Sequence, residues 1–192
     1  MAISLSKGQT ISLNKVSDNL NHLHVGVGWD PAIPKGLIAR LTGPKEIDLD
    51  ASVITFDQKK EPTGIVYFGK LESPDGAIKH MGDNLTGDGD GDDEVIAVDL
   101  TRLDDTTETL VFFVNSYQGH TFEEVDNAYC RVTDADSGQE FCRYTLSDKG
   151  AHTGVVMAIL SRNAGDWQIK AVGMPGVGRT ADQLVPDALR HI

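Results

Sequence analysis

Hydrophobic and polar residues alternate with a period of two along much of the chain. From Leu23 to Trp29, every second residue is apolar, and histidines and glycines stand between. This alternation is typical of a β-strand with one buried face. The same rhythm returns at 47–56, 65–68, 95–100, 110–114, 130–132, 141–146, 155–160 and 167–172. The pattern predicts about nine or ten short strands.

Turn-forming sequences separate these segments, for example Ser73-Pro74-Asp75-Gly76 and the stretch 134–138. Many short strands joined by such turns predict an all-β fold, a two-sheet antiparallel β-sandwich. Strands do not alternate with long helices, which disfavours a doubly wound fold. We expect only two short peripheral helices, at 121–127 and 180–191. No internal repeat or low-complexity linker divides the chain, so residues 1–192 are expected to form a single domain.

The composition narrows the class of protein. The chain has 192 residues, of which 40% are hydrophobic, and its net charge is −12. It can therefore bury a substantial core. An acidic protein repels phosphate backbones, so we expect no nucleic-acid partner and favour divalent cations or basic protein surfaces. The sequence shows no signal peptide and no transmembrane segment, which predicts a cytoplasmic protein.

Half of the net charge comes from one segment, Asp83 to Glu94, which holds six carboxylates, one Asn and no base. Single glycines separate Asp88, Asp90 and Asp92, and they allow the backbone to curl so that the carboxylates converge. Oxygen ligands without nearby Cys or His favour Ca²⁺, and Mg²⁺ normally uses fewer carboxylates. Six carboxylates exceed the need of one ion, so two Ca²⁺ ions with shared ligands are expected. The alternative is a flexible, solvated turn without metal.

The same segment matches the first, third and fifth positions of an EF-hand loop, and the match then fails. Asp93 stands where that loop needs glycine, and Asp99 stands where it needs a bidentate Glu. The segment also runs into a predicted strand at 95–100 rather than between two helices. A calcium loop on a β-sandwich is therefore the better interpretation.

The run from Gly82 to Glu94 closely resembles the signature of the bacterial tellurium-resistance TerD family. The resemblance extends over nearly the whole chain, through 4–8, 26–30, 48–52, 127–131 and 166–168. It implies a Ca²⁺-binding β-sandwich found in tellurite-resistance and general stress-response systems, without established catalytic activity. The chain departs from many relatives at Asp88, where they often carry Glu, and this shortens one potential ligand by a methylene.

The metal ligands are expected in two places. The loop and the strand at 47–56 together supply this set: Asp83, Asn84, Asp88, Asp90, Asp92, Glu94, Asp48 and Asp50. The last two share one face of their strand, from which they could close the cage, and the alternative is that this face is merely exposed. Asp30 is a weaker candidate, because an Asp before Pro commonly just starts a turn.

Two cysteines raise a separate question. Cys130 and Cys142 are symmetric about Asp136, so a hairpin through that turn would place them opposite one another, close enough for a disulfide. In a reducing cytoplasm we expect them instead to be reduced, small apolar residues on the core face. The sequence has no nucleophile elbow, phosphate loop or catalytic dyad spacing, so we expect no enzyme.

The principal hypothesis is a non-enzymatic, calcium-dependent β-sandwich that presents a surface to other proteins of a tellurite-resistance or stress system. The alternative is a calcium-dependent module that binds membrane surfaces in the manner of C2 domains. It is disfavoured because the sequence shows no exposed apolar or basic loop tips flanking Asp83 to Glu94. An enzyme acting on oxyanions is also disfavoured, because the chain is acidic and offers no cluster of Arg or Lys.

Overall fold

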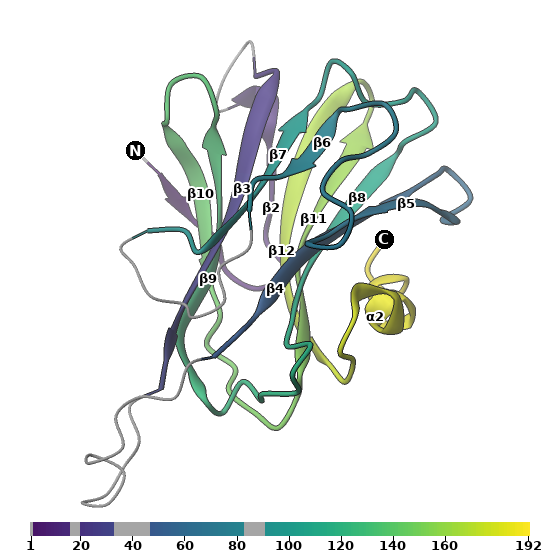
Figure 1. Ribbon diagram of the computed structural model, residues 1–192. Helices are drawn as coiled ribbons and strands as arrows, with labels where there is room; N and C mark the ends of the chain where they lie inside the picture. The colour runs from purple at the N-terminus through teal and green to yellow at the C-terminus, as the bar shows by residue number, and fades with distance from the viewer. Residues whose placement is uncertain (1, 16–19, 33–46, 83–90) are drawn as a thin grey trace, which may run out of the picture.

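The computed structural model describes residues 2–15, 20–32, 47–82 and 91–192. Two six-stranded sheets pack face to face, which confirms the predicted β-sandwich (Figure 1). The first sheet contains, in spatial order, β1 Ile3–Ser4, β10 Glu140–Thr145, β9 Val125–Asp134, β3 His22–Pro31, β7 Glu94–Asp99 and β6 Ile78–His80. The second contains β2 Thr10–Ser12, β12 Asp166–Gly176, β11 Gly154–Asn163, β8 Thr109–Asn115, β4 Asp50–Phe56 and β5 Pro62–Val66.

Neighbouring strands are antiparallel except for the short pair β1 and β10, which run parallel. A 3-10 turn at Leu13–Lys15 follows β2, and the helix α2, Ala181–Ala188, lies near the C-terminal end. This helix lies within the range 180–191 that the sequence predicts.

The main core lies between the sheets and follows from the period-two alternation. Val25 and Val27 of β3 face Val53 of β4 and Phe112 of β8 within one apolar cluster, and none is more than 3% exposed. A second cluster lies on the outer face of the second sheet, where Leu184 of α2 packs with the outward residues of β4, β8 and β11. The central strands of this sheet are therefore buried on both faces, and β4 is buried at all seven positions.

The helix predicted at 121–127 is wrong. Glu124 donates its backbone N–H to the carbonyl of Thr121 at 2.9 Å, which closes a single turn, and β9 then begins at Val125. Val125 pairs with Pro31, so the chain continues as a strand beside β3. Pairing between distant segments prevails here over the local preference for a helical turn.

The predicted facing of the two cysteines is also wrong, because a bulge between Glu140 and Cys142 shifts the register of β10 against β9. Cys142 pairs with Val132, and Cys130 pairs with Tyr144. Both thiols are free and buried, which confirms the expected core-face role. Burial raises the pKa of both thiols, that of Cys142 to about 12, so they stay protonated at neutral pH.

The docking of α2 gives a stability prediction. Leu184 is fully buried against Gly154 and Gly176, where any added Cβ would collide with its methyl groups. We expect Leu184→Ala to lower the free energy of unfolding by about 2–5 kcal/mol, because it leaves a cavity under the helix. Leu189→Ala, at a residue that is 38% exposed, is the matched control and should cost less than about 1 kcal/mol. Equal losses in urea titrations would contradict the packing described here.

Candidate functional site

The structure describes half of the predicted metal ligands. Asp48, Asp50, Asp92 and Glu94 lie in its described part. Asp83, Asn84, Asp88 and Asp90 lie outside the described residues.

Glu94 is the first residue of β7 and points between the two sheets. Its side chain is completely buried, and its Oε2 accepts a hydrogen bond from the backbone N–H of Ala51 at 2.6 Å. The same oxygen lies 3.2 Å from Nε2 of His80 on β6. Because β7 belongs to the first sheet and Ala51 to the second, this carboxylate connects the two sheets at their end.

Asp50 is the first residue of β4 and Asp48 lies two residues before it; both are also buried, with exposed fractions of 5% and 8%. The alternative of an exposed strand face is therefore wrong. The Oδ2 of Asp50 accepts the backbone N–H of Tyr117 at 3.1 Å, and the Oδ2 of Asp48 accepts the Nε2 amide of Gln118 at 2.9 Å. The loop after β8 thus holds both carboxylates.

The second carboxylate oxygen of Asp48 differs from the first. Oδ1 is buried and has no hydrogen-bond partner within the part of the chain that the structure describes. A buried carboxylate oxygen without a donor or a cation is energetically costly and uncommon in folded proteins. This atom therefore marks a position where a positive ligand would lower the free energy of the fold.

The three buried carboxylates lie near the start of β4 but not on one face of it, because Glu94 lies between the sheets, whereas Asp50 alternates with the core residue Ala51 and points to the outer face. Ala51 directly follows Asp50, so Glu94 reaches β4 next to that residue. Asp48 lies two residues further back along the same segment. Among the described residues, no group of three or more His, Cys, Asp or Glu side chains is arranged to hold a metal ion. A metal centre at this end would therefore need additional ligands from elsewhere in the acidic segment.

Asp92 lies apart from these carboxylates, over Gly26 on the outer face of the first sheet, where a Cβ on the glycine would overlap it. Its Oδ1 is 2.7 Å from Nε of Arg131, and the hydroxyl of Tyr129 donates to it at 3.0 Å. The structure therefore gives Asp92 a positive partner and does not bring it together with Glu94. The neighbouring Asp93 accepts the backbone N–H of Trp29 at 2.8 Å.

The outer face of the first sheet carries two arginines that sequence reasoning did not place together. Arg131 and Arg143 are direct register partners on β9 and β10, and both donate to Glu140, Arg131 at 3.1 Å and Arg143 at 2.8 Å. The hydrogen bond from Arg143 lowers the pKa of Glu140, and the hydrogen bond to Asp92 raises the pKa of Arg131. Burial, aided by the charge of Asp92, raises the pKa of Tyr129 to about 12. The face is thus a network of paired charges.

His80 was also missed by sequence reasoning. It is 4% exposed and follows Ile78 on the inward face of β6, where it meets Glu94 because β6 pairs with β7. The only signal in the sequence is its period-two spacing from Ile78, which does not distinguish a buried histidine from an exposed one.

Comparison with known proteins shows which family the chain is similar to. Residues 1–185 match the family model of the TerD domain. The chain is 49% identical to the tellurium resistance protein TerZ of Serratia marcescens, and the alignment covers 99% of this chain and 98% of that protein. It is 41% identical to the stress response protein SCP2 of Bacillus subtilis, with 90% and 92% covered.

A solved structure shows the same fold. The crystal structure of a TerD homologue from Streptomyces coelicolor A3(2) superposes with a TM-score of 0.68 at 24% identity, covering 87% of this chain and 96% of that one. In the described part of the chain, no helix has the length and apolar character needed to cross a membrane.

The bridge made by Glu94 can be tested by its removal. We expect Glu94→Ala to cost about 3 kcal/mol or more in EDTA, because it leaves the buried N–H of Ala51 without this acceptor and His80 without this carboxylate. Glu72→Ala is the control, since Glu72 pairs with Lys79 at 3.3 Å while both side chains are about half exposed. That substitution should cost less than about 1 kcal/mol. Similar denaturation midpoints for both variants would refute the bridging role.

Proposed function

The chain belongs to the TerD family, and from that premise we propose that it is a calcium-binding, non-enzymatic protein of a tellurite-resistance or stress-response system. In this proposal, Ca²⁺ orders one end of the sandwich, which then presents a surface to other proteins of that system in the cytoplasm. Relatives named for tellurium resistance and for stress response, each aligned over at least 90% of the chain, support the assignment to such a system. We assign no reaction, because the sequence carries no recognised catalytic motif.

The observation that carries the calcium proposal is the buried, unpartnered Oδ1 of Asp48. It belongs to a set of buried carboxylates that also includes Asp50 and Glu94. Ca²⁺ takes six to eight oxygen ligands in tolerant geometry, and carboxylates are its usual protein ligands. The described donors are therefore of the right chemical kind, and the sequence supplies more of them nearby.

The additional ligands in this proposal are Asp83, Asn84, Asp88 and Asp90, which precede the described carboxylates of the same acidic segment. Their number is the reason to propose two ions. Asp92 already has Arg131 as its positive partner, so we place it outside the ligand set and assign it to anchoring the end of the segment on the first sheet.

The substitution Asp48→Asn distinguishes a metal ligand from a simple buried acid. In Ca²⁺, loss of a ligand lowers the melting temperature, whereas removal of a simple buried charge does not. In EDTA, the variant should melt at an equal or higher temperature, since a buried charge is removed. In Ca²⁺, its affinity should fall about tenfold or more, equivalent to about 1.4 kcal/mol, and it should melt below wild type. Calorimetric titration and thermal melts in both buffers measure these effects.

Asp105→Asn serves as the control, because Asp105 is exposed and lies outside the acidic segment. It removes the same charge and should leave Ca²⁺ affinity unchanged within about twofold. If Asp48→Asn behaves like Asp105→Asn in both buffers, the calcium assignment at this position is overturned.

One observation favours the second candidate, a calcium-dependent membrane-surface module. Met81, two residues before Asp83, is 60% exposed, and Leu71 on the adjoining segment is 51% exposed. The backbone N–H of His80 donates to the carbonyl of Leu71 at 2.8 Å, which places these segments side by side. Apolar side chains therefore do flank the start of the acidic segment, contrary to the sequence expectation. Such side chains can enter a lipid interface.

Vesicle sedimentation separates the two functions. We expect wild type to remain in the supernatant with phosphatidylserine vesicles, in Ca²⁺ and in EDTA alike, because the acidic surface repels anionic lipid. Calcium-dependent sedimentation that Met81→Ser abolishes would favour the membrane function instead. Val177→Ser is the control, since Val177 is 81% exposed and precedes α2, away from the acidic segment in the sequence.

A further inference from the structure

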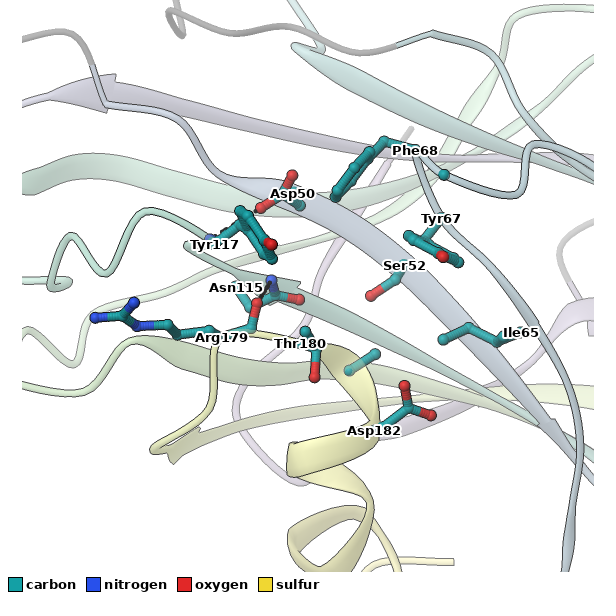
Figure 2. Close-up of a pocket in the computed structure, with 12 residues that line it drawn as sticks. Asp50, Ser52, Ile65, Tyr67, Phe68, Asn115, Tyr117, Arg179, Thr180 and Asp182 are labelled. Carbon is teal, nitrogen blue, oxygen red and sulfur yellow. Dashed lines mark hydrogen bonds between the residues drawn. The ribbon is translucent and has the colours of Figure 1, made fainter.

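A cavity of about 450 Å³ lies on the outer face of the second sheet, where the N-terminus of α2 meets the turn that follows β5 (Figure 2). Its base is formed by residues of β4 and β8, and its walls by the segment 67–69, Tyr117 and the first residues of α2. This volume lies within the range of roughly 300–1,000 Å³ that is typical of small-molecule sites.

Three aromatic rings form one side of the cavity. The ring centroids of Tyr67 and Phe68 are 5.3 Å apart at an interplanar angle of 79°, and those of Phe68 and Tyr117 are 6.1 Å apart at 72°. Rings that are nearly perpendicular to each other present faces in different directions, as in the aromatic cages that surround ammonium groups. The rings are not parallel, so they do not form the stacking surfaces that would suit a planar base.

The charges of the lining residues agree with a cationic ligand. Asp50 lies at one end, held by the backbone N–H of Tyr117, and Asp182 lies at the other, in the first turn of α2. The guanidinium of Arg179 points away from the other lining side chains in Figure 2. The net charge of −12 also favours the approach of cations over that of anions.

The base of the cavity is polar, and its residues are already positioned without a ligand. Ser52 is 3% exposed, and its Oγ is buried without a hydrogen-bond partner among the described residues. The Nδ2 of Asn115 donates to the carbonyl of Arg179 at 2.8 Å, which fixes the start of α2 against β8. An unsatisfied hydroxyl under a preformed aromatic wall is a feature of a binding site rather than of a packed core.

We propose that this cavity binds a small organic ammonium ion. The cation would lie against the faces of Tyr67, Phe68 and Tyr117, and the carboxylate of Asp182 would supply opposite charge. This site is distinct from the proposed calcium centre in its chemistry, because aromatic rings do not coordinate Ca²⁺ but do attract ammonium groups. The inference goes beyond the proposed function and does not depend on calcium.

The test is a titration of the isotopically labelled protein with choline chloride, followed by NMR at constant ionic strength in EDTA. We expect saturable shifts of the backbone amides of Ser52 and Tyr117. The uncharged isostere of choline, with a tert-butyl group in place of trimethylammonium, should bind at least about threefold more weakly, because it lacks the cation–π attraction. Methyl glucoside should produce no saturable shift.

Variants locate the site. Phe68→Leu and Tyr117→Leu keep apolar bulk but remove a ring, and each should weaken choline binding about two- to fivefold. Asp182→Asn should also weaken it. Leu71→Ala is the control, because Leu71 is 51% exposed and does not line the cavity. Thermal melts verify that each variant folds.

Three results would overturn the proposal: equal binding of choline and its isostere, unchanged affinity in both ring variants, or no saturable shift at all. Because the titration is run in EDTA, a failure of calcium binding in the Asp48→Asn experiment leaves this outcome unaffected. The two proposals can therefore fail separately.

Discussion

The rest of the structure depends on how negative charge is held where the two sheets meet. Glu94 crosses from the first sheet to the backbone of Ala51 on the second, and Asp50 and Asp48, one and three residues before Ala51, are buried as well. Carboxylates taken out of water destabilise a fold unless hydrogen bonds or cations compensate them. Backbone amides and Gln118 provide part of this compensation, and the remaining demand, at Oδ1 of Asp48, is what makes a calcium ion the natural partner in our proposal.

Two residues earlier in the same acidic segment, a carboxylate is compensated in a different way. Asp92 turns to the outer face of the first sheet and pairs with Arg131, while Glu94 turns inward. Asp92 and Glu94 are two residues apart, so strand alternation alone would place them on one face. The chain bends at Asp93, before β7 begins at Glu94, and the two acids therefore lie in different environments. One face carries its own arginines, and the other has His80 near Glu94 and backbone donors. The count of carboxylates in a sequence therefore overstates how many can reach one ion.

Period-two alternation was sufficient to predict the sandwich, since the longer strands carry their own signal, whereas the short strands β1, β2 and β6 were not predicted. The predictions that failed concern relations between strands. The bulge at Glu140 moved Cys142 out of line with Cys130, and pairing of Val125 with Pro31 replaced the predicted helix. Asp48 and Asp50 are equally instructive, because Tyr117 and Gln118, distant in the sequence, cover both side chains. No local sequence pattern shows which distant residues cover a side chain. The aromatic cavity could not be predicted for the same reason, because its lining comes from four separate segments.

Asp50 links the two proposed sites. Its carboxylate belongs to the buried acids at the end of β4, and it also lines the aromatic cavity, where the backbone of Tyr117 donates to it. If both proposals hold, a cation at either site reduces the negative potential at the other, and the two ligands weaken each other's binding by the same factor. The loop that carries Tyr117 and Gln118 strengthens this connection, because one residue forms a cavity wall and the next holds Asp48. Calcium would then act on the organic ligand through charge and through one short loop, without any rearrangement of the sheets.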